Sequence, residues 1–305
     1  MKEVFGPRVS KRGFTLTELF VVITMVAILV TLSLPARSST RFRDRQVQCL
    51  NNCKQLASAW HLYATDYGHY PPNPDDPGNG ITYHHWVPNA AAASGSSVFN
   101  PDPYYDGRNC LVAQYLGGNI AIFHCPADLR TGLYSGTQNP ALIGKIIPAV
   151  RTVSASGAVG TVCDGFWNCG AHDNTPPRHP VNGPWLDGTH SACRGNGVYA
   201  TFGKPSDFTV ISPSMVFMIA DENPDSINDG ALGTVAALNN LQYIDWPASL
   251  HNGACTFSFC DGHAEAHKWL GNILQGPFIG SRITPIDAAN RADLVWLANH
   301  SSTLK

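Results

Sequence analysis

The sequence predicts an α+β fold in which a long N-terminal helix, transmembrane in its first half, packs on a C-terminal antiparallel β-sheet head with long loops. An apolar run near the N-terminus continues into a stretch with apolar residues at helical spacing, which predicts one long helix. Short apolar segments near the C-terminus, two of them joined by Asp261-Gly262, predict strands and a hairpin. The 28 Gly and 22 Pro residues among 305 predict long loops between these elements.

Residues 14–34 form an apolar run in which Glu18 is the only charged residue. At about 1.5 Å rise per residue the run reaches roughly 30 Å, the thickness of a bilayer core. Basic residues before the run favour a cytoplasmic N-terminus. A plain signal anchor and a cleaved secretory signal are alternatives. However, the run is long for a secretory signal, no A-x-A-like site precedes Pro35, and a plain anchor leaves Glu18 unexplained.

The segment KRGFTLTELFVVITMVAILVTLSLP (residues 11–35) resembles the cleavage and methylation signal of type IV pilins and type II secretion pseudopilins. The resemblance implies that a prepilin peptidase/methyltransferase cleaves after Gly13 and methylates the new N-terminal residue, Phe14. It also implies that Glu18 pairs with the N-terminal amine of a neighbouring subunit, since a buried carboxylate needs a partner. The expected partners are this enzyme, identical or related pilin-like subunits, and the inner membrane before assembly.

The second half of the predicted helix is amphipathic. Apolar residues recur at spacings near three and four between Val47 and Tyr63, with Cys53 on the same stripe, so this half is expected to lie against the head. Gly68 and Pro71-Pro72 end the helix. The predicted regions are a leader (1–13), a transmembrane assembly helix (14–35), its amphipathic continuation (36–68) and a pilin-like head with loop insertions (69–305).

Charge and cysteine content limit the partners. The formal net charge is −2 and no basic stripe follows Arg45, so no nucleic-acid partner is expected.

Nine cysteines in an exported chain favour disulfides, and the odd count leaves at least one without an intrachain pair. Alternatives for the middle of the chain are a zinc site, from the spacings Cys169-x-x-His172 and His190-x-x-Cys193, or a sugar-contacting surface near Trp167 and Trp185. The candidate disulfide cysteines are Cys110, Cys125, Cys163, Cys169 and Cys193.

Three segments in the C-terminal part of the chain predict strands. Met215–Ala220 is a short apolar run bounded by Pro213 and by acidic residues. Ala254–Cys260 and Ala264–Leu270 flank Asp261-Gly262, a dipeptide that supplies the positive φ needed by a tight hairpin turn. Weaker patterns predict a short helix at 111–116 and strands at 120–125, 143–153 and 198–202.

Oxygen-bearing side chains crowd the end of the strand predicted at 215–220. Hard oxygen donors at short spacing suit Ca²⁺, although the pattern is not that of an EF-hand loop. A polar turn with helix-capping residues is the alternative. The predicted calcium ligands are Asp221, Glu222, Asp225, Asn228 and Asp229.

Nine residues separate His251 from Asp261-Gly262, which matches the H-X9-DG signature of a large bacterial group of prepilin-processed proteins. The stretches FHCPADLR (residues 123–130) and FMIADENPDSINDG (residues 217–230) resemble further segments of that group. This resemblance implies an architecture and does not imply an activity.

His251 and Asp261 lie at opposite ends of one predicted strand and are too far apart to touch. His251 is instead expected to meet Asp221 and Glu222 on a neighbouring strand, and His263 to meet Asp261. A histidine–carboxylate hydrogen bond that fixes strand ends is the favoured interpretation. A metal site of Asp221, Glu222, His251 and Asp261 is the alternative.

The leading hypothesis for function is structural. The resemblance implies a subunit of a type IV pilus-like or type II secretion pseudopilus-like filament, cleaved after Gly13 and assembled through its N-terminal helix. It implies a single-pass inner-membrane protein that then enters a periplasmic or extracellular filament. One alternative is a prepilin-processed surface protein whose head binds polysaccharide, and another is a metal-dependent hydrolase. The chain has no G-x-S-x-G and no H-E-x-x-H motif, so no enzymatic activity is expected.

Overall fold

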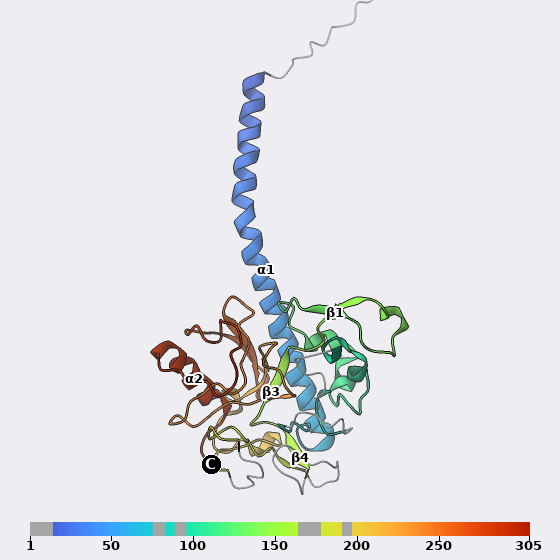
Figure 1. The fold of residues 1–305 in the computed structure, drawn as a ribbon, viewed down its shortest axis with the longest axis vertical. Coiled ribbons are helices and arrows are strands. Elements are labelled where there is room, and N and C mark those ends of the chain that lie inside the picture. The colour runs from blue at the N-terminus through green and yellow to red at the C-terminus, as the bar shows by residue number, and fades with distance from the viewer. Residues whose placement is uncertain (1–14, 76–82, 89–95, 164–177, 191–196) are drawn as a thin grey trace, which may run out of the picture. The chain divides into compact units, whose positions relative to one another are not determined.

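A computed structural model describes residues 15–75, 83–88, 96–163, 178–190 and 197–305, although the side chains of 30–42 and 163 are not described (Figure 1). The predicted cleavage and methylation residues, Gly13 and Phe14, lie outside these ranges. The chain divides after Asp44 into two compact units, and the second unit, 45–305, is called the head below.

Helix α1 runs from Leu16 to Tyr67. It begins with reciprocal hydrogen bonds: the Thr15 amide donates to Glu18 Oε2 (2.8 Å), and the Glu18 amide donates to Thr15 Oγ1 (3.3 Å). This is a capping box, which satisfies amides that have no partner within the helix. The helix ends at Gly68, whose φ of +77° suits the left-handed conformation that terminates helices.

The predicted location in the inner membrane is wrong. No helix in the part of the chain that the structure describes combines the length and the apolar character needed to cross a bilayer.

Five strands form the main sheet of the head, in the order β7-β3-β6-β8-β9. Three of the four pairings are antiparallel, but β7 pairs with β3 in the parallel direction. The predicted fold class is therefore wrong: the sheet is mixed rather than antiparallel, and the described residues include no helix suited to span a membrane. The strands are β3 (Val153–Ser156), β6 (Phe217–Asp221), β7 (Ala231–Leu232), β8 (Ala254–Phe259) and β9 (Ala264–Lys268).

The hairpin predicted around Asp261-Gly262 is confirmed. Strands β8 and β9 pair antiparallel on either side of it. Gly262 has a φ of +92°, and the Phe259 amide donates to the carbonyl of His263 (2.9 Å). A residue with a side chain is strained at that φ, which explains the glycine.

Short elements complete the head. Two antiparallel pairs lie outside the main sheet, β1 with β2 and β4 with β5. The strand predicted at 120–125 is instead a 3-10 helix, and the helix predicted at 111–116 is also a 3-10 helix. A C-terminal helix, α2, was not predicted. The bounds are β1 (Thr131–Leu133), β2 (Ile146–Pro148), β4 (Thr161–Cys163), β5 (Arg178–Pro180), η3 (Ala113–Leu116), η4 (Ile120–Phe123) and α2 (Ala288–Ser301).

The remaining 3-10 helices are single turns within the loops of the head: η1 (Ser96–Phe99), η2 (Asp102–Tyr105), η5 (Pro140–Leu142), η6 (Pro205–Asp207) and η7 (Pro213–Met215).

Two of the hydrophobic clusters among the described residues include residues of the main sheet and are called its cores below. The first unites the C-terminal part of α1 with β3 and β6, and Figure 1 shows β3 beside this part of α1. The second unites β8 with α2, because alternate residues of β8 (Cys255, Phe257 and Phe259) point to the same side as Leu294 and Leu297. The head therefore holds the C-terminal part of α1 as a component of its own core.

Candidate metal centre

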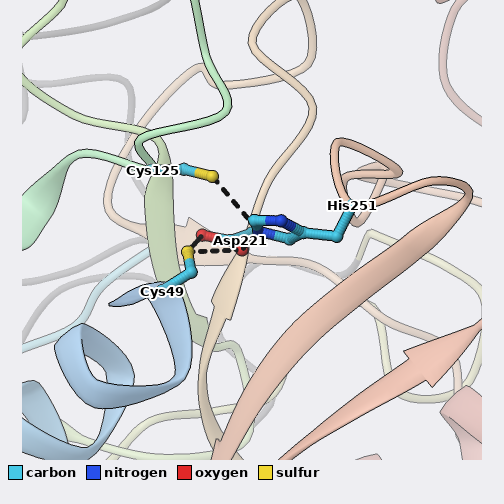
Figure 2. A group of neighbouring side chains, drawn as sticks. All are labelled: Cys49, Cys125, Asp221 and His251. Atoms are coloured by element: carbon cyan, nitrogen blue, oxygen red, sulfur yellow. Dashed lines mark hydrogen bonds and ion pairs between the residues drawn. The ribbon is translucent and has the colours of Figure 1, made fainter. Parts of the chain in front are cut away.

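Four buried side chains meet between α1 and the sheet: Cys49, Cys125, Asp221 and His251 (Figure 2). Their potential ligand atoms all lie within 4.8 Å of one another. Cys49 Sγ lies 3.1 and 3.0 Å from the two carboxylate oxygens of Asp221. His251 Nε2 lies 3.3 Å from Cys125 Sγ and 3.4 Å from Asp221 Oδ2. Among the described Cys, His, Asp and Glu residues, no other group gathers its ligand atoms this closely.

Cys49 and Asp221 are placed by regular secondary structure. Cys49 lies on the buried stripe of α1, one turn before Cys53, which contacts Thr256 in β8. Asp221 is the last residue of β6, between β3 and β8. The Thr256 hydroxyl donates to Asp221 Oδ2, which holds the carboxylate toward α1.

Cys125 and His251 come from loops that are held in place by hydrogen bonds of their backbone amides. The Cys125 amide donates to Thr152 Oγ1 (2.5 Å), just before β3. The chain leading to His251 follows the end of β6, because the Ala248 amide donates to the carbonyl of Asp221 (2.9 Å). His251 then precedes a turn in which Asn252 and Gly253 both have positive φ, and this turn leads into β8.

The centre places four ionisable side chains next to one another in a buried position, and each changes the pKa of at least one of the others. Contact with the Cys125 and Cys53 thiols, burial and the Asp221 charge raise the pKa of Cys49. The hydrogen bond from Cys49 outweighs burial and lowers the pKa of Cys125. Burial opposes the charged form of His251, but hydrogen bonds to Asp221 and Cys125 outweigh it and raise its pKa to about 9. The four side chains are therefore coupled by hydrogen bonds within one buried cluster.

The arrangement does not suit a cysteine nucleophile. In a nucleophile–histidine–carboxylate triad, the two partners bind opposite nitrogens of the imidazole ring. Here Cys125 and Asp221 both face Nε2, and Nδ1 of His251 has no hydrogen-bond partner among the described residues. The site brings two acidic groups, Cys125 and Asp221, to one ring nitrogen, an arrangement that a bound metal ion would also give.

The structure revises the metal site predicted from Asp221, Glu222, His251 and Asp261. His251 does meet Asp221, as expected, but Glu222 turns away to accept a hydrogen bond from the Ser154 hydroxyl. Asp261 lies at the exposed hairpin turn, where its carboxylate contacts His263 Nδ1 (2.6 Å), the pairing predicted for these two residues.

The residues predicted to bind calcium do not point to one place. Asp221 faces Cys49, whereas Asp225 and Asn228 are exposed. Asp229 is buried and accepts from the Ala231 amide (2.7 Å), and burial followed by repulsion from other acidic residues raises its pKa. Calcium binding stays a prediction.

The predicted disulfides are not formed by the cysteines that the structure describes. Cys110 and Cys125 are both buried free thiols. The side chain of Cys163 and all of Cys169 and Cys193 lie outside the described residues, so disulfides and zinc binding there stay predictions.

The predicted sugar-contacting surface has one described tryptophan. Trp185 packs against His190 in a tilted arrangement, with 4.8 Å between ring centroids, and Trp167 lies outside the described ranges.

The sequence did not identify Cys49 and Cys125 as members of this centre. Cys49 was given no role by the sequence, and Cys125 was assigned to a candidate disulfide and to the segment FHCPADLR. The contact between Cys49 and Asp221 spans 172 positions of sequence, so no local spacing could reveal it.

A family model described as "Protein of unknown function (DUF1559)" matches residues 39–193. The matched segment contains Cys49 and Cys125 but ends before Asp221 and His251. It also excludes the N-terminal cleavage signal and the H-X9-DG hairpin, so the match shows neither. No curated protein and no solved structure matches the chain.

Proposed function

The chain belongs to the DUF1559 family, and we propose that it is a structural, pilin-like surface subunit that assembles through the N-terminal part of α1. Family membership supports the coarser, pilin-like part of this proposal. The resemblance of residues 11–35 to a prepilin signal supports cleavage after Gly13 by a prepilin peptidase, and other copies of the chain are the proposed assembly partners.

The observation that carries the proposal is the exposed apolar surface at the start of α1. Between Leu16 and Leu29 the exposed large apolar side chains include Phe20 (67 % exposed) and Met25 (61 % exposed). They point to all sides of the helix, because Leu19, Phe20, Val21 and Val22 are consecutive and all at least half exposed. A helix that is apolar on all sides is normally covered. Bundling of the same segment from several copies provides that cover.

Glu18 has one role in the single chain, as a cap of α1, and a second, proposed role in the assembly, as the partner of an amine. In the single chain its carboxylate accepts hydrogen bonds from the amide and hydroxyl of Thr15, both at 2.8 Å, and these bonds lower the pKa of Glu18. It therefore caps α1. In an assembly the same charged carboxylate is close in sequence to the amine that cleavage after Gly13 would free, and an apolar bundle leaves that charge in need of an opposite one.

Replacement of Glu18 by Gln separates these roles. Glutamine retains an acceptor oxygen for the capping box but carries no charge. We expect Glu18→Gln to be cleaved normally, to keep its helix content by far-ultraviolet circular dichroism, and to lose filaments in electron micrographs of material released from the cell surface. Glu265→Gln, which changes an exposed acid on β9, is the matched control and should assemble normally.

Gly13→Ala tests the processing step. Mass spectrometry of the N-terminus should find the leader retained in this variant and removed in the parent chain and in Glu18→Gln. Filaments of normal abundance from Glu18→Gln would show that Glu18 only caps the helix. Filaments of normal abundance from uncleaved Gly13→Ala would refute assembly through the processed N-terminus.

The proposal is structural rather than catalytic because of the buried centre. Cys125 and His251 are both less than a tenth exposed, and the apolar cleft of about 220 Å³ lined by residues such as Tyr105, Ile120 and Ile147 does not include them. An activated nucleophile needs access to a substrate.

A further inference from the structure

We infer that Cys49, Cys125, Asp221 and His251 form a structural zinc site that fastens helix α1 to the sheet of the head. This site shares no residue with the proposed assembly surface, which consists of residues 16–29. The argument rests on the kind of ligands, their spacing, their orientation and their origin in the fold.

The ligand types select a transition metal. Two thiols, an imidazole and a carboxylate match the donors that Zn²⁺ accepts, and four protein ligands without an open position are typical of structural zinc. Calcium and magnesium prefer oxygen donors throughout. With both thiols and Asp221 ionised and His251 neutral, a divalent ion reduces the charge of the site from −3 to −1.

The distances suit a tetrahedral ion. With Zn–S of about 2.3 Å and Zn–N or Zn–O of about 2.0–2.1 Å, neighbouring ligand atoms in a tetrahedron lie about 3.3–3.8 Å apart. The contacts of His251 Nε2 with Cys125 Sγ (3.3 Å) and with Asp221 Oδ2 (3.4 Å) agree with this range. The distances from Cys49 Sγ to the two Asp221 oxygens (3.0 and 3.1 Å) are shorter than this range by a few tenths of an ångström. Zinc binding therefore requires only a small outward movement of these two side chains.

The orientation of His251 favours an ion over a simple ion pair. One Nε2–H can make one well-directed hydrogen bond, yet Nε2 faces both Cys125 and Asp221 (Figure 2). A lone pair on Nε2 directed at a metal accounts for both contacts, because every ligand atom then faces the same centre.

The origin of the ligands gives the site a structural role. Cys49 belongs to α1, Asp221 to β6, and Cys125 and His251 to two loops that meet beside β3 and β8. An ion bound here links four segments that are distant in sequence, and it connects α1 to the sheet at the start of the part of α1 that lies in the head.

The test uses the purified full chain, kept reduced and in mild detergent because of its exposed apolar helix. After incubation with Zn²⁺ alone and gel filtration, elemental analysis should find one zinc per chain. Co²⁺ in place of Zn²⁺ should give the absorption bands of a tetrahedral site with thiolate ligands. Cys125→Ala and His251→Gln should each weaken Zn²⁺ binding at least tenfold, measured by competition with a chelator.

Cys260→Ala is the matched control, because Cys260 is another buried free thiol of the head but is not part of the centre. It should bind one zinc with parental affinity. The Co²⁺ spectrum of the parent chain keeps the test valid if a ligand variant fails to fold. The inference is overturned if the reduced parent chain retains no zinc, if Cys260→Ala loses zinc as Cys125→Ala does, or if peptide mapping of the freshly isolated protein finds a Cys49–Cys125 disulfide.

Discussion

Trp60 is one of the largest fully buried side chains of the head and belongs to α1, so its removal gives a quantitative test of the fold. Trp60 is fully buried (0 % exposed) in the first core. Its ring centroid lies 5.4 Å from that of Trp86 in an edge-to-face arrangement and 6.0 Å from that of Tyr70. We expect Trp60→Ala to destabilise the head strongly.

The magnitude follows from burial and ring contacts. Truncation of a buried Trp to Ala costs about 3–5 kcal/mol through lost burial and the cavity that remains. Two aromatic pairs, worth about 0.5–1.5 kcal/mol each, place the expected loss in the upper part of that range. Trp60→Phe should lose less, about 1–2 kcal/mol, because it keeps a ring. It also removes an indole N–H that has no hydrogen-bond partner among the described residues.

The assay is urea unfolding followed by circular dichroism, with the free energy of unfolding taken from the linear dependence on urea. Leu62→Ala is the control on the same helix, since Leu62 is 50 % exposed, and it should cost less than about 1 kcal/mol. Equal losses from Trp60→Ala and Leu62→Ala would refute the placement of Trp60 in the core.

Two further predictions concern the head. Burial, followed by the charge of His300, lowers the pKa of His267 to about 4, below the 6.5 expected for an unfolded chain. Stability should therefore be complete above pH 6.5 and fall by about 1–2 kcal/mol, after allowance for partial exposure, as pH decreases through 4. In unfolding measurements across pH, His267→Phe should reduce this dependence, and an unchanged dependence would contradict the assignment. Gly160→Ala should lower the free energy of unfolding by about 2–4 kcal/mol, because the new Cβ would lie 2.6 Å from Asn73 Cβ at a φ of +117°. Gly117→Ala, with φ +58° and no atom within 4 Å of the new Cβ, should lose only about 1 kcal/mol, and an equal loss would exclude the close contact as the cause.

Local patterns in the sequence predicted some elements of the fold and not others. The Asp261-Gly262 hairpin was predicted because its turn chemistry lies in two adjacent residues. The run at 120–125 was misassigned as a strand because a short apolar segment carries no periodicity that separates it from a helical turn. Strand β7 has only two residues and pairs in parallel with β3, so the mixed character of the sheet had no sequence signal.

The candidate site was predictable only in part for a related reason. The contact of His251 with Asp221 followed from the expectation that they lie on neighbouring strands. Cys49 and Cys125 reach the same place through the packing of α1 and of a loop beside β3, which depends on the whole core rather than on any local spacing. The acidic residues after β6 were assigned to one calcium site because sequence proximity does not show that Asp221 and Glu222 face different neighbours.

The centre and the apolar core hold the same helix by different means. Trp60, Leu56 and Ala64 pack on the sheet through apolar contacts that depend on no ligand. Cys49 lies two turns before Leu56 and contacts the sheet through ionisable groups. Loss of an ion from this centre would therefore leave the later turns of α1 packed, while the turn that contains Cys49 would lose its bridge to β6 and to the loops of Cys125 and His251 and keep only weaker hydrogen bonds there.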